Sequence, residues 1–170
     1  GLSDQPILGV VLTHQHIDHT GGLDVLEVLP IWTTQSEMKA EQSIGSFTWR
    51  WHTARHNLRF VDLEGEKKTI LGKKRSVVSL RPDQSLEIIQ LGGHTPGSLA
   101  VRLQNKTMPI WFIGDLAFDR TGLEASAPLA GIHADPMEVR MIHSELQQEP
   151  ALILTAHEDN IPNLFQNFAE

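Results

Sequence analysis

The segment from His14 to His19 (HQHIDH) gathers three imidazoles and one carboxylate within six residues. Imidazole is the commonest metal ligand in proteins. Because side chains alternate along an extended chain, His14 and His16 would point to the same side and reach one cation. Once the chain turns into a helix, Asp18 and His19 can face a second cation, and metals paired about 3.5–4 Å apart recur in hydrolytic sites.

Three further segments each deliver a candidate ligand after an apolar run that predicts a buried strand. They are IIQLGGH with His94, WFIGD with Asp115 and LILTAH with His157. Open α/β folds bind ligands at the carboxyl ends of their strands, so we expect these residues to join the first cluster. Thr95 is a candidate hydroxyl for orienting a metal ligand.

The first part of the chain alternates strand and helix. The apolar run Ile7 to Leu12 predicts a strand buried on both faces, and residues 23–29 have helical spacing that Pro30 closes. Residues 30–33 predict a short strand. A capping box at Thr34 to Glu37 then begins a helix that we expect to reach about Ile44.

The middle of the chain is rich in predicted strands. An antiparallel meander is predicted for the segments 58–63, 69–71, 76–80 and 86–91. Two more strands follow at 98–103 and 109–113, then a helix capped by Asp135 that runs to about Glu149, then a strand at 151–155. Trp32 and Trp111 are expected in the core, and His143 beside the buried face of the late helix. We predict one α/β domain over residues 1–170, with stacked sheets covered by helices.

Composition removes several function classes. Fourteen Lys and Arg against 21 Asp and Glu give a formal charge of −7, which disfavours nucleic acid as a partner. No apolar run approaches the roughly 18 residues that span a membrane. The chain has no Cys, which excludes thiolate ligands and a thiol nucleophile, and no Tyr. Its first residues carry no targeting signal, which favours the cytoplasm but leaves the compartment open.

These motifs resemble those of the metallo-β-lactamase-fold hydrolases. The resemblance spans nearly the whole chain and is carried by HQHIDH, by GHTPG at residues 93–97, by Gly114-Asp115 and by Ala156-His157. It implies an αββα sandwich. It also implies one metal held by His14, His16 and His94, a second held by Asp18, His19 and His157, and a bridging carboxylate from Asp115.

Among the branches of this family, the chain is more similar to lactonases and thioester hydrolases than to true β-lactamases. The Asp18-His19 pair with a bridging Asp115 carries this similarity, and residues 30–37 also look like acyl-homoserine-lactone lactonases. The lactonases share an active-site tyrosine, which this chain lacks. The family also has several strands before its first motif. We therefore expect an N-terminally incomplete domain, completed by a missing segment or by a second copy of the chain.

The predicted function is hydrolysis of a small ester, lactone or thioester by a hydroxide that bridges two divalent ions. Zinc is the first expectation, and His and Asp ligands also suit iron or manganese. Asp18 would orient this nucleophile and pass a proton to the leaving group. Two alternatives stay open, namely a phosphodiester or RNA hydrolase of the same fold and a non-catalytic member that binds metal or a small ligand.

The substrate side of the site is the least defined by the sequence. An aromatic and basic stretch contains Trp49, Trp51 and His52, and it predicts either a flap lining the substrate pocket or a packed loop. His133 precedes the cap of the late helix and is a further candidate for this pocket.

Overall fold

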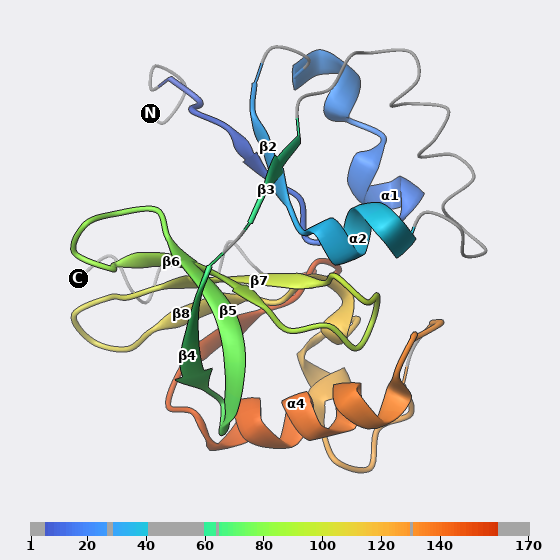
Figure 1. Cartoon of the computed structure of the whole chain (residues 1–170). Helices are drawn as coiled ribbons and strands as arrows, with labels where there is room; N and C mark the ends of the chain where they lie inside the picture. The colour runs from blue at the N-terminus through green and yellow to red at the C-terminus, as the bar shows by residue number, and fades with distance from the viewer. Residues whose placement is uncertain (1–5, 27–28, 41–59, 64, 130, 160–170) are drawn as a thin grey trace.

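The computed structural model describes residues 6–26, 29–40, 60–63, 65–129 and 131–159. Within them the strands form two sheets (Figure 1). The smaller sheet is parallel, in the order β1 (Val10–Val11), β2 (Ile31–Thr33) and β3 (Phe60–Asp62). The larger sheet has six strands in chain order: β4 (Glu66–Ile70), β5 (Lys73–Ser79), β6 (Leu86–Gln90), β7 (Leu99–Leu103), β8 (Ile110–Phe112) and β9 (Leu152–Leu154).

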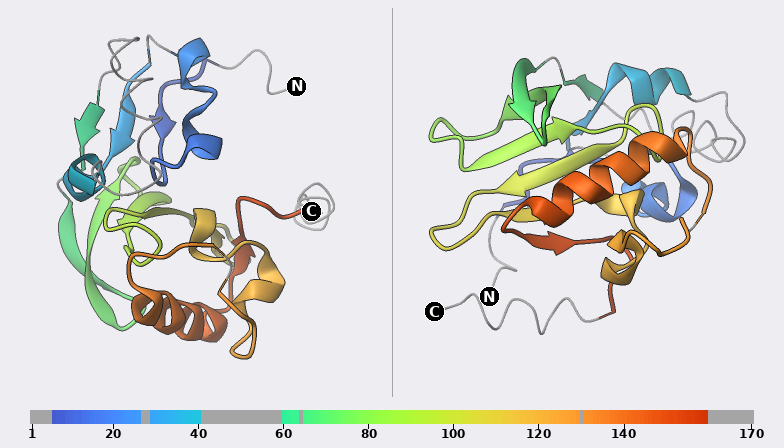
Figure 2. Two further views of the ribbon diagram at one scale, coloured as in Figure 1. Left: turned by 90° about the vertical axis from the view of Figure 1, so that its right-hand side faces the viewer. Right: turned by 90° about the horizontal axis from the view of Figure 1, so that it is seen from below.

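Helices lie on the outer sides of the two sheets (Figure 2). Beside the smaller sheet lie α1 (Ile17–Thr20) and α2 (Gln35–Lys39), and across the larger sheet lies α4 (Pro136–Gln148). Three short 3-10 helices are η2 (Leu23–Leu26), η4 (Gly114–Leu116) and η5 (Arg120–Leu123). The α/β fold with stacked sheets is confirmed, and none of the helices described here is long and apolar enough to cross a membrane.

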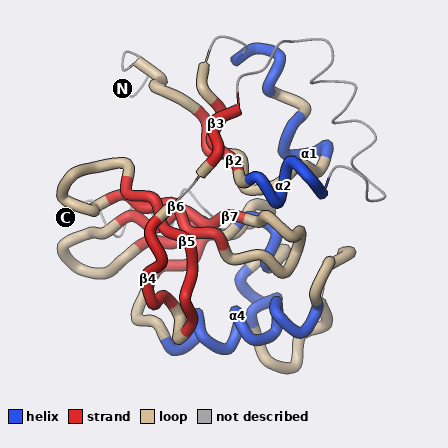
Figure 3. Tube along the Cα trace, in the orientation of Figure 1, coloured by secondary structure: helices blue, strands red, loops and turns tan. Residues whose placement is uncertain are grey.

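The longest helix forms where its sequence signals predict it. The Asp135 side chain accepts a hydrogen bond of 2.9 Å from the backbone N–H of Glu138, which satisfies a donor that the first helical turn leaves free. Val139, Ile142 and Leu146 of α4 are fully buried in one core with residues of the larger sheet. Burial of this apolar face in a core that includes Trp111 holds α4 against the larger sheet. Figure 3 shows α4 running beside the strands of that sheet.

Two predictions about the smaller sheet are wrong. The strand predicted for Ile7 to Leu12 is only Val10–Val11, and Ile7 and Leu8 are 63% and 77% exposed. The neighbouring strand β2 begins at Ile31, so the described chain offers Ile7 and Leu8 no strand to pair with. The strand at Phe60–Asp62 pairs in parallel with β2 and does not join the antiparallel meander.

Other elements differ from prediction mainly in length. The helix expected over residues 23–29 is the 3-10 helix η2, and α2 is described only as Gln35–Lys39, since residues 41–44 lie outside the described chain. The remaining meander strands, β4 to β6, are antiparallel as predicted. A hydrogen bond of 2.9 Å from Leu99 N–H to Thr13 C=O joins the larger sheet to the loop that leaves β1. The two sheets are thereby connected beside the His cluster.

Candidate metal centre

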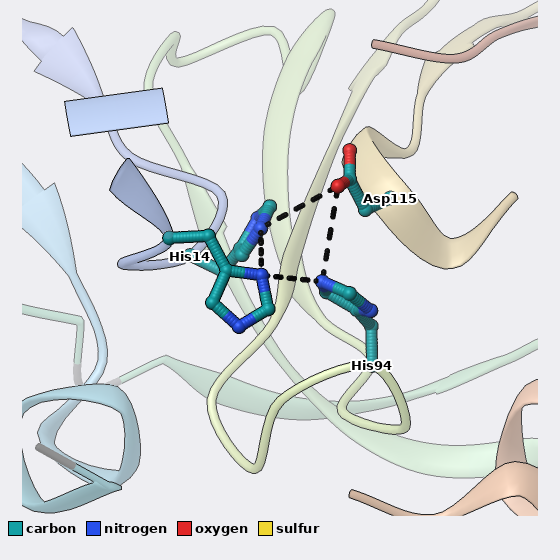
Figure 4. A group of neighbouring side chains, drawn as sticks. His14, His94 and Asp115 are labelled. Atoms are coloured by element: carbon teal, nitrogen blue, oxygen red, sulfur yellow. Dashed lines mark hydrogen bonds and ion pairs between the residues drawn. The ribbon is translucent and has the colours of Figure 1, made fainter. Parts of the chain in front are cut away.

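The first cluster consists of His14, His16, His94 and Asp115 (Figure 4). His16 Nδ1 lies 3.1 Å from His14 Nε2 and 3.0 Å from His94 Nε2. Asp115 Oδ2 lies 3.7 Å from His14 Nε2 and 3.9 Å from His94 Nε2. The four donor atoms are all within 4.8 Å of one another. Three ring nitrogens and one carboxylate oxygen therefore converge on one small volume.

The second cluster shares Asp115 with the first. The second carboxylate oxygen of Asp115, Oδ1, lies 3.2 Å from His19 Nε2 and 3.4 Å from His157 Nε2. Asp18 Oδ2 closes the group at 3.5 Å from His19 Nε2 and 3.7 Å from His157 Nε2. One carboxylate thus presents one oxygen to each cluster, and the structure brings together all seven residues that the sequence proposed as ligands.

The strand ends position these side chains. His14, His94, Asp115 and His157 each stand three or four residues beyond the carboxyl end of a strand, namely β1, β6, β8 and β9. The last three of these strands run in the same direction within one sheet, so their ends lie at the same edge. Asp18 and His19 lie in α1, which begins directly after His16.

Glycine allows the loop of His94 to reach the cluster. Gly93 has a φ of 84°, a backbone conformation that residues with a side chain rarely adopt. A Cβ atom at this position would also lie 2.9 Å from Val139 Cγ2, closer than side chains approach. The glycine therefore sets both the turn of the loop and its packing against α4.

The charge states of the cluster suit a cation. Burial lowers the pKa of His14 to about 2 and that of His94 to about 4, and neighbouring imidazoles contribute in the same direction. Burial would raise the pKa of Asp115, but nearby imidazoles, above all His19, outweigh it and hold that pKa at about 2. Near neutral pH, His14 and His94 therefore present unprotonated ring nitrogens beside the Asp115 carboxylate.

The donor set fits divalent metal ions. Imidazole nitrogen and carboxylate oxygen are the ligands of catalytic zinc sites. His19 Nε2 and Asp115 Oδ1 are buried and accept or donate no hydrogen bond to the part of the chain described. Buried polar atoms normally have hydrogen-bond partners, and a cation bound beside both of these atoms, which lie 3.2 Å apart, would satisfy them.

The predicted substrate residues have different outcomes. His133 lies beside the first cluster, with its Nδ1 at 3.1 Å from His94 Nδ1, on the side of the ring away from the other ligands. It contacts a candidate ligand, and its role as a substrate residue stays a prediction. Trp49, Trp51 and His52 lie outside the described residues.

Two residues near the site were not identified as functional from the sequence. Glu37 was expected only as part of a capping box, but its carboxylate is buried against the loops that carry His14, His16 and His94. Phe118 is 52% exposed, and its ring stacks on the imidazole of His157 at 4.4 Å between ring centroids. In the sequence, the only signal for Phe118 is an aromatic residue three positions after Asp115. Its exposure is known only from the structure.

The fold therefore consists of two sheets flanked by helices, with a His- and Asp-rich centre at the ends of the strands. The family model described as the metallo-beta-lactamase superfamily matches residues 1–157. The chain therefore belongs to the metallo-β-lactamase superfamily, which confirms the resemblance seen in the motifs.

Known relatives place the chain near two branches of this family. It is 20% identical to an N-acyl homoserine lactonase of Bacillus sp over 93% of this chain and 58% of that protein. It is 27% identical to the human acyl-coenzyme A thioesterase MBLAC2 over 68% of this chain and 43% of that protein. The chain thus spans about half the length of these relatives.

A solved structure shows the same fold. An N-acyl homoserine lactone hydrolase, with its product N-hexanoyl-L-homoserine bound at the catalytic metal centre, superposes with a TM-score of 0.68 at 17% sequence identity. The match covers 93% of this chain and 58% of that one.

Proposed function

We propose that this chain is a dinuclear metal-dependent hydrolase that cleaves a small ester, lactone or thioester. The observation that carries this proposal is Asp115, whose two carboxylate oxygens face two separate groups of ligands. A residue placed in this way can hold two ions at the short separation that hydrolytic sites use.

The seven clustered residues supply the ligands for both ions. His14, His16 and His94 would hold one ion, and Asp18, His19 and His157 the other. Two bound divalent ions lower the pKa of water and polarise a carbonyl oxygen, which together are the chemistry that acyl hydrolysis needs. Zinc fits the nitrogen and oxygen donors, and iron or manganese are compatible with them.

Asp18 is the proposed general acid-base residue. Its side chain is 53% exposed, whereas the shared Asp115 side chain is 15% exposed, so Asp18 lies at the open side of the centre. A carboxylate there can orient the attacking water and then deliver a proton to the departing alcohol or thiol. No serine or cysteine nucleophile is needed, and hydrolysis would proceed without a covalent intermediate.

The site and the relatives support the proposed substrate class. The exposed ring of Phe118 gives an apolar surface beside His157 that suits an acyl group, and the formal charge of −7 disfavours a nucleic-acid substrate. One relative acts on acyl homoserine lactones and another on acyl-coenzyme A thioesters, according to their names.

A panel of substrates tests this proposal. Protein loaded with zinc or manganese would be assayed on a lactone, a thioester, a phosphodiester and a β-lactam, with metal content measured in parallel. We expect turnover of the lactone or thioester, and we expect Asp18→Asn to slow it by about 10²–10⁴-fold, the usual size of a general acid-base contribution. Asp83→Asn, in an exposed turn of the larger sheet, is the matched control.

Two results would contradict the proposal. Efficient hydrolysis of the β-lactam with inert lactone and thioester would place the chain in another branch of the family. Preference for the phosphodiester would favour the alternative hydrolase named above.

A further inference from the structure

Glu37 is a buried carboxylate that belongs to neither metal cluster. It lies in α2, its relative exposure is 2%, and α2 is capped by another residue. The cap is Thr34, whose Oγ1 accepts a hydrogen bond of 3.0 Å from Glu37 N–H. The carboxylate is therefore not needed to begin the helix, and a buried charge without a function would be costly.

The carboxylate of Glu37 accepts hydrogen bonds from both loops that carry the histidines of the first cluster. Its Oε1 accepts 2.9 Å from the backbone N–H of Gln15, the residue between His14 and His16. Its Oε2 accepts 2.5 Å from the hydroxyl of Thr95, the residue directly after His94. Oε2 also accepts 3.1 Å from Gly97 N–H, and Gln15 Nε2 donates to the Glu37 backbone oxygen.

The direction of each proton is fixed by this arrangement. Backbone N–H groups can only donate, so both carboxylate oxygens must accept. The single hydroxyl proton of Thr95 goes to Glu37, which leaves the Ser98 hydroxyl, 2.7 Å away, to donate to Thr95 Oγ1. Thr95 N–H in turn donates to Ser98 Oγ at 2.9 Å. The carboxylate is thus part of a hydrogen-bond network with Thr95 and Ser98 in the His94 loop.

Helix α2 and the His94 loop are also in direct contact. Thr34 Oγ1 donates to Gly97 C=O at 3.1 Å, beside the Glu37 bonds. A Cβ atom on Gly97 would overlap the Thr34 hydroxyl and the Glu37 side chain. The loop therefore approaches α2 as closely as a backbone can, and the carboxylate sits at that contact.

We propose that Glu37 is a positioning residue, which holds the His14–His16 segment and the His94 loop at the separation that the first metal ion requires. It connects Gln15 to Thr95 and Gly97, which are 80 or more residues away in the chain, while touching no candidate ligand side chain itself. The inference rests on the proposed function only in requiring that the first cluster binds a metal.

Glu37→Gln tests the proposal with almost no change of shape. One carboxylate oxygen becomes an NH₂ group, and because both oxygens face N–H donors, either orientation of the amide sets donor against donor. Zinc affinity would be measured for each of the two ions by competition with a chromophoric chelator, and cobalt absorption would report the ligand geometry. Loss of a residue that orients ligands typically weakens metal binding by about 10–100-fold.

Three further variants separate positioning from general stability. Thr95→Val removes the hydroxyl that donates a hydrogen bond to Glu37. Thr95→Ser keeps a hydroxyl there and should bind metal almost as tightly as the unmodified protein. Glu87→Gln is the matched control, because Glu87 is equally buried at 2% but pairs with Lys68 and Arg102 in the larger sheet. It should lower the melting temperature without changing metal affinity.

The proposal predicts that Glu37→Gln and Thr95→Val weaken the binding of one ion by about tenfold or more and alter the cobalt spectrum, while the other binding step changes less. Unchanged affinities and spectrum in these two variants would overturn it, and so would an equal loss of affinity in Glu87→Gln. If Glu37→Gln does not fold, the comparison of Thr95→Val with Thr95→Ser decides alone. An unmodified protein that binds no divalent ion would instead contradict the proposed function.

Discussion

At the scale of residues, the sequence predicted that the candidate ligands come together and that Thr95 stands beside them, but it did not predict the contacts of Glu37. His14, His16, Asp18 and His19 stand so close in the chain that their spacing alone indicates a metal site. Glu37 contacts Gln15, 22 residues before it, and Thr95, 58 residues after it, and only the folded chain shows these contacts. The sequence indicated Glu37 as one half of a capping box, but its carboxylate accepts hydrogen bonds from the loops of His14 and His94 and not from the start of its own helix.

Asp115 is the residue on which both clusters depend. We predict that Asp115→Ala weakens the binding of both metal ions together, by more than the 10–100-fold that a residue outside the ligand shell contributes. Isothermal titration with zinc, compared with the exposed Asp83→Ala control, measures this. Loss of one ion with normal binding of the other would show that Asp115 is a ligand of a single ion.

At the scale of elements, local signals predicted the longest helix, α4. The cap of Asp135 and the apolar face of α4 are both local, and α4 agrees with its prediction. The strand β3 was assigned to the wrong sheet because its partner, β2, is chosen by tertiary packing. The strand at β1 is shorter than predicted because an apolar run does not reveal where its neighbour begins.

The contact of α2 with the His94 loop gives a prediction at this scale. Gly97→Ala places a methyl group against Thr34 and Glu37, so we expect the free energy of unfolding to fall by about 1–3 kcal/mol, as in overpacked cores. The matched control is Gly122→Ala, where the nearest atom, Ala117 Cβ, is 3.7 Å away. Urea unfolding of both variants measures the difference, and equal stability of the two would show that the loop can move away from α2 at little cost.

At the scale of the whole molecule, one face of the larger sheet is less well covered than the other. Val101 and Phe112 are paired neighbours on the face opposite α4, and Phe112 is 37% exposed. Leu103 and Met108 are only half-buried beside the same face. A longer lactone hydrolase shares this fold, and the match covers 58% of that chain, so we propose that further strands, from a longer polypeptide or from a second copy, cover this face.

We therefore predict that the 170-residue chain alone forms a dimer or, as a monomer, binds a hydrophobic dye. Phe112→Lys should reduce the dye signal or shift the dimer toward monomer, because it places a charge on the exposed apolar face. Sedimentation velocity and dye fluorescence measure these effects. A monodisperse monomer that binds no dye and melts at high temperature would show that the chain closes its own core.

The central claim is that this chain holds two divalent ions through one shared carboxylate, and metal stoichiometry tests it most directly. The purified protein, stripped with a chelator and titrated with zinc, would be measured by mass spectrometry under native conditions and by elemental analysis. Seven ligand residues exceed what one tetrahedral ion can use, so we predict about two ions per chain. A limit of one ion per chain, unchanged by excess zinc or manganese, would contradict the account.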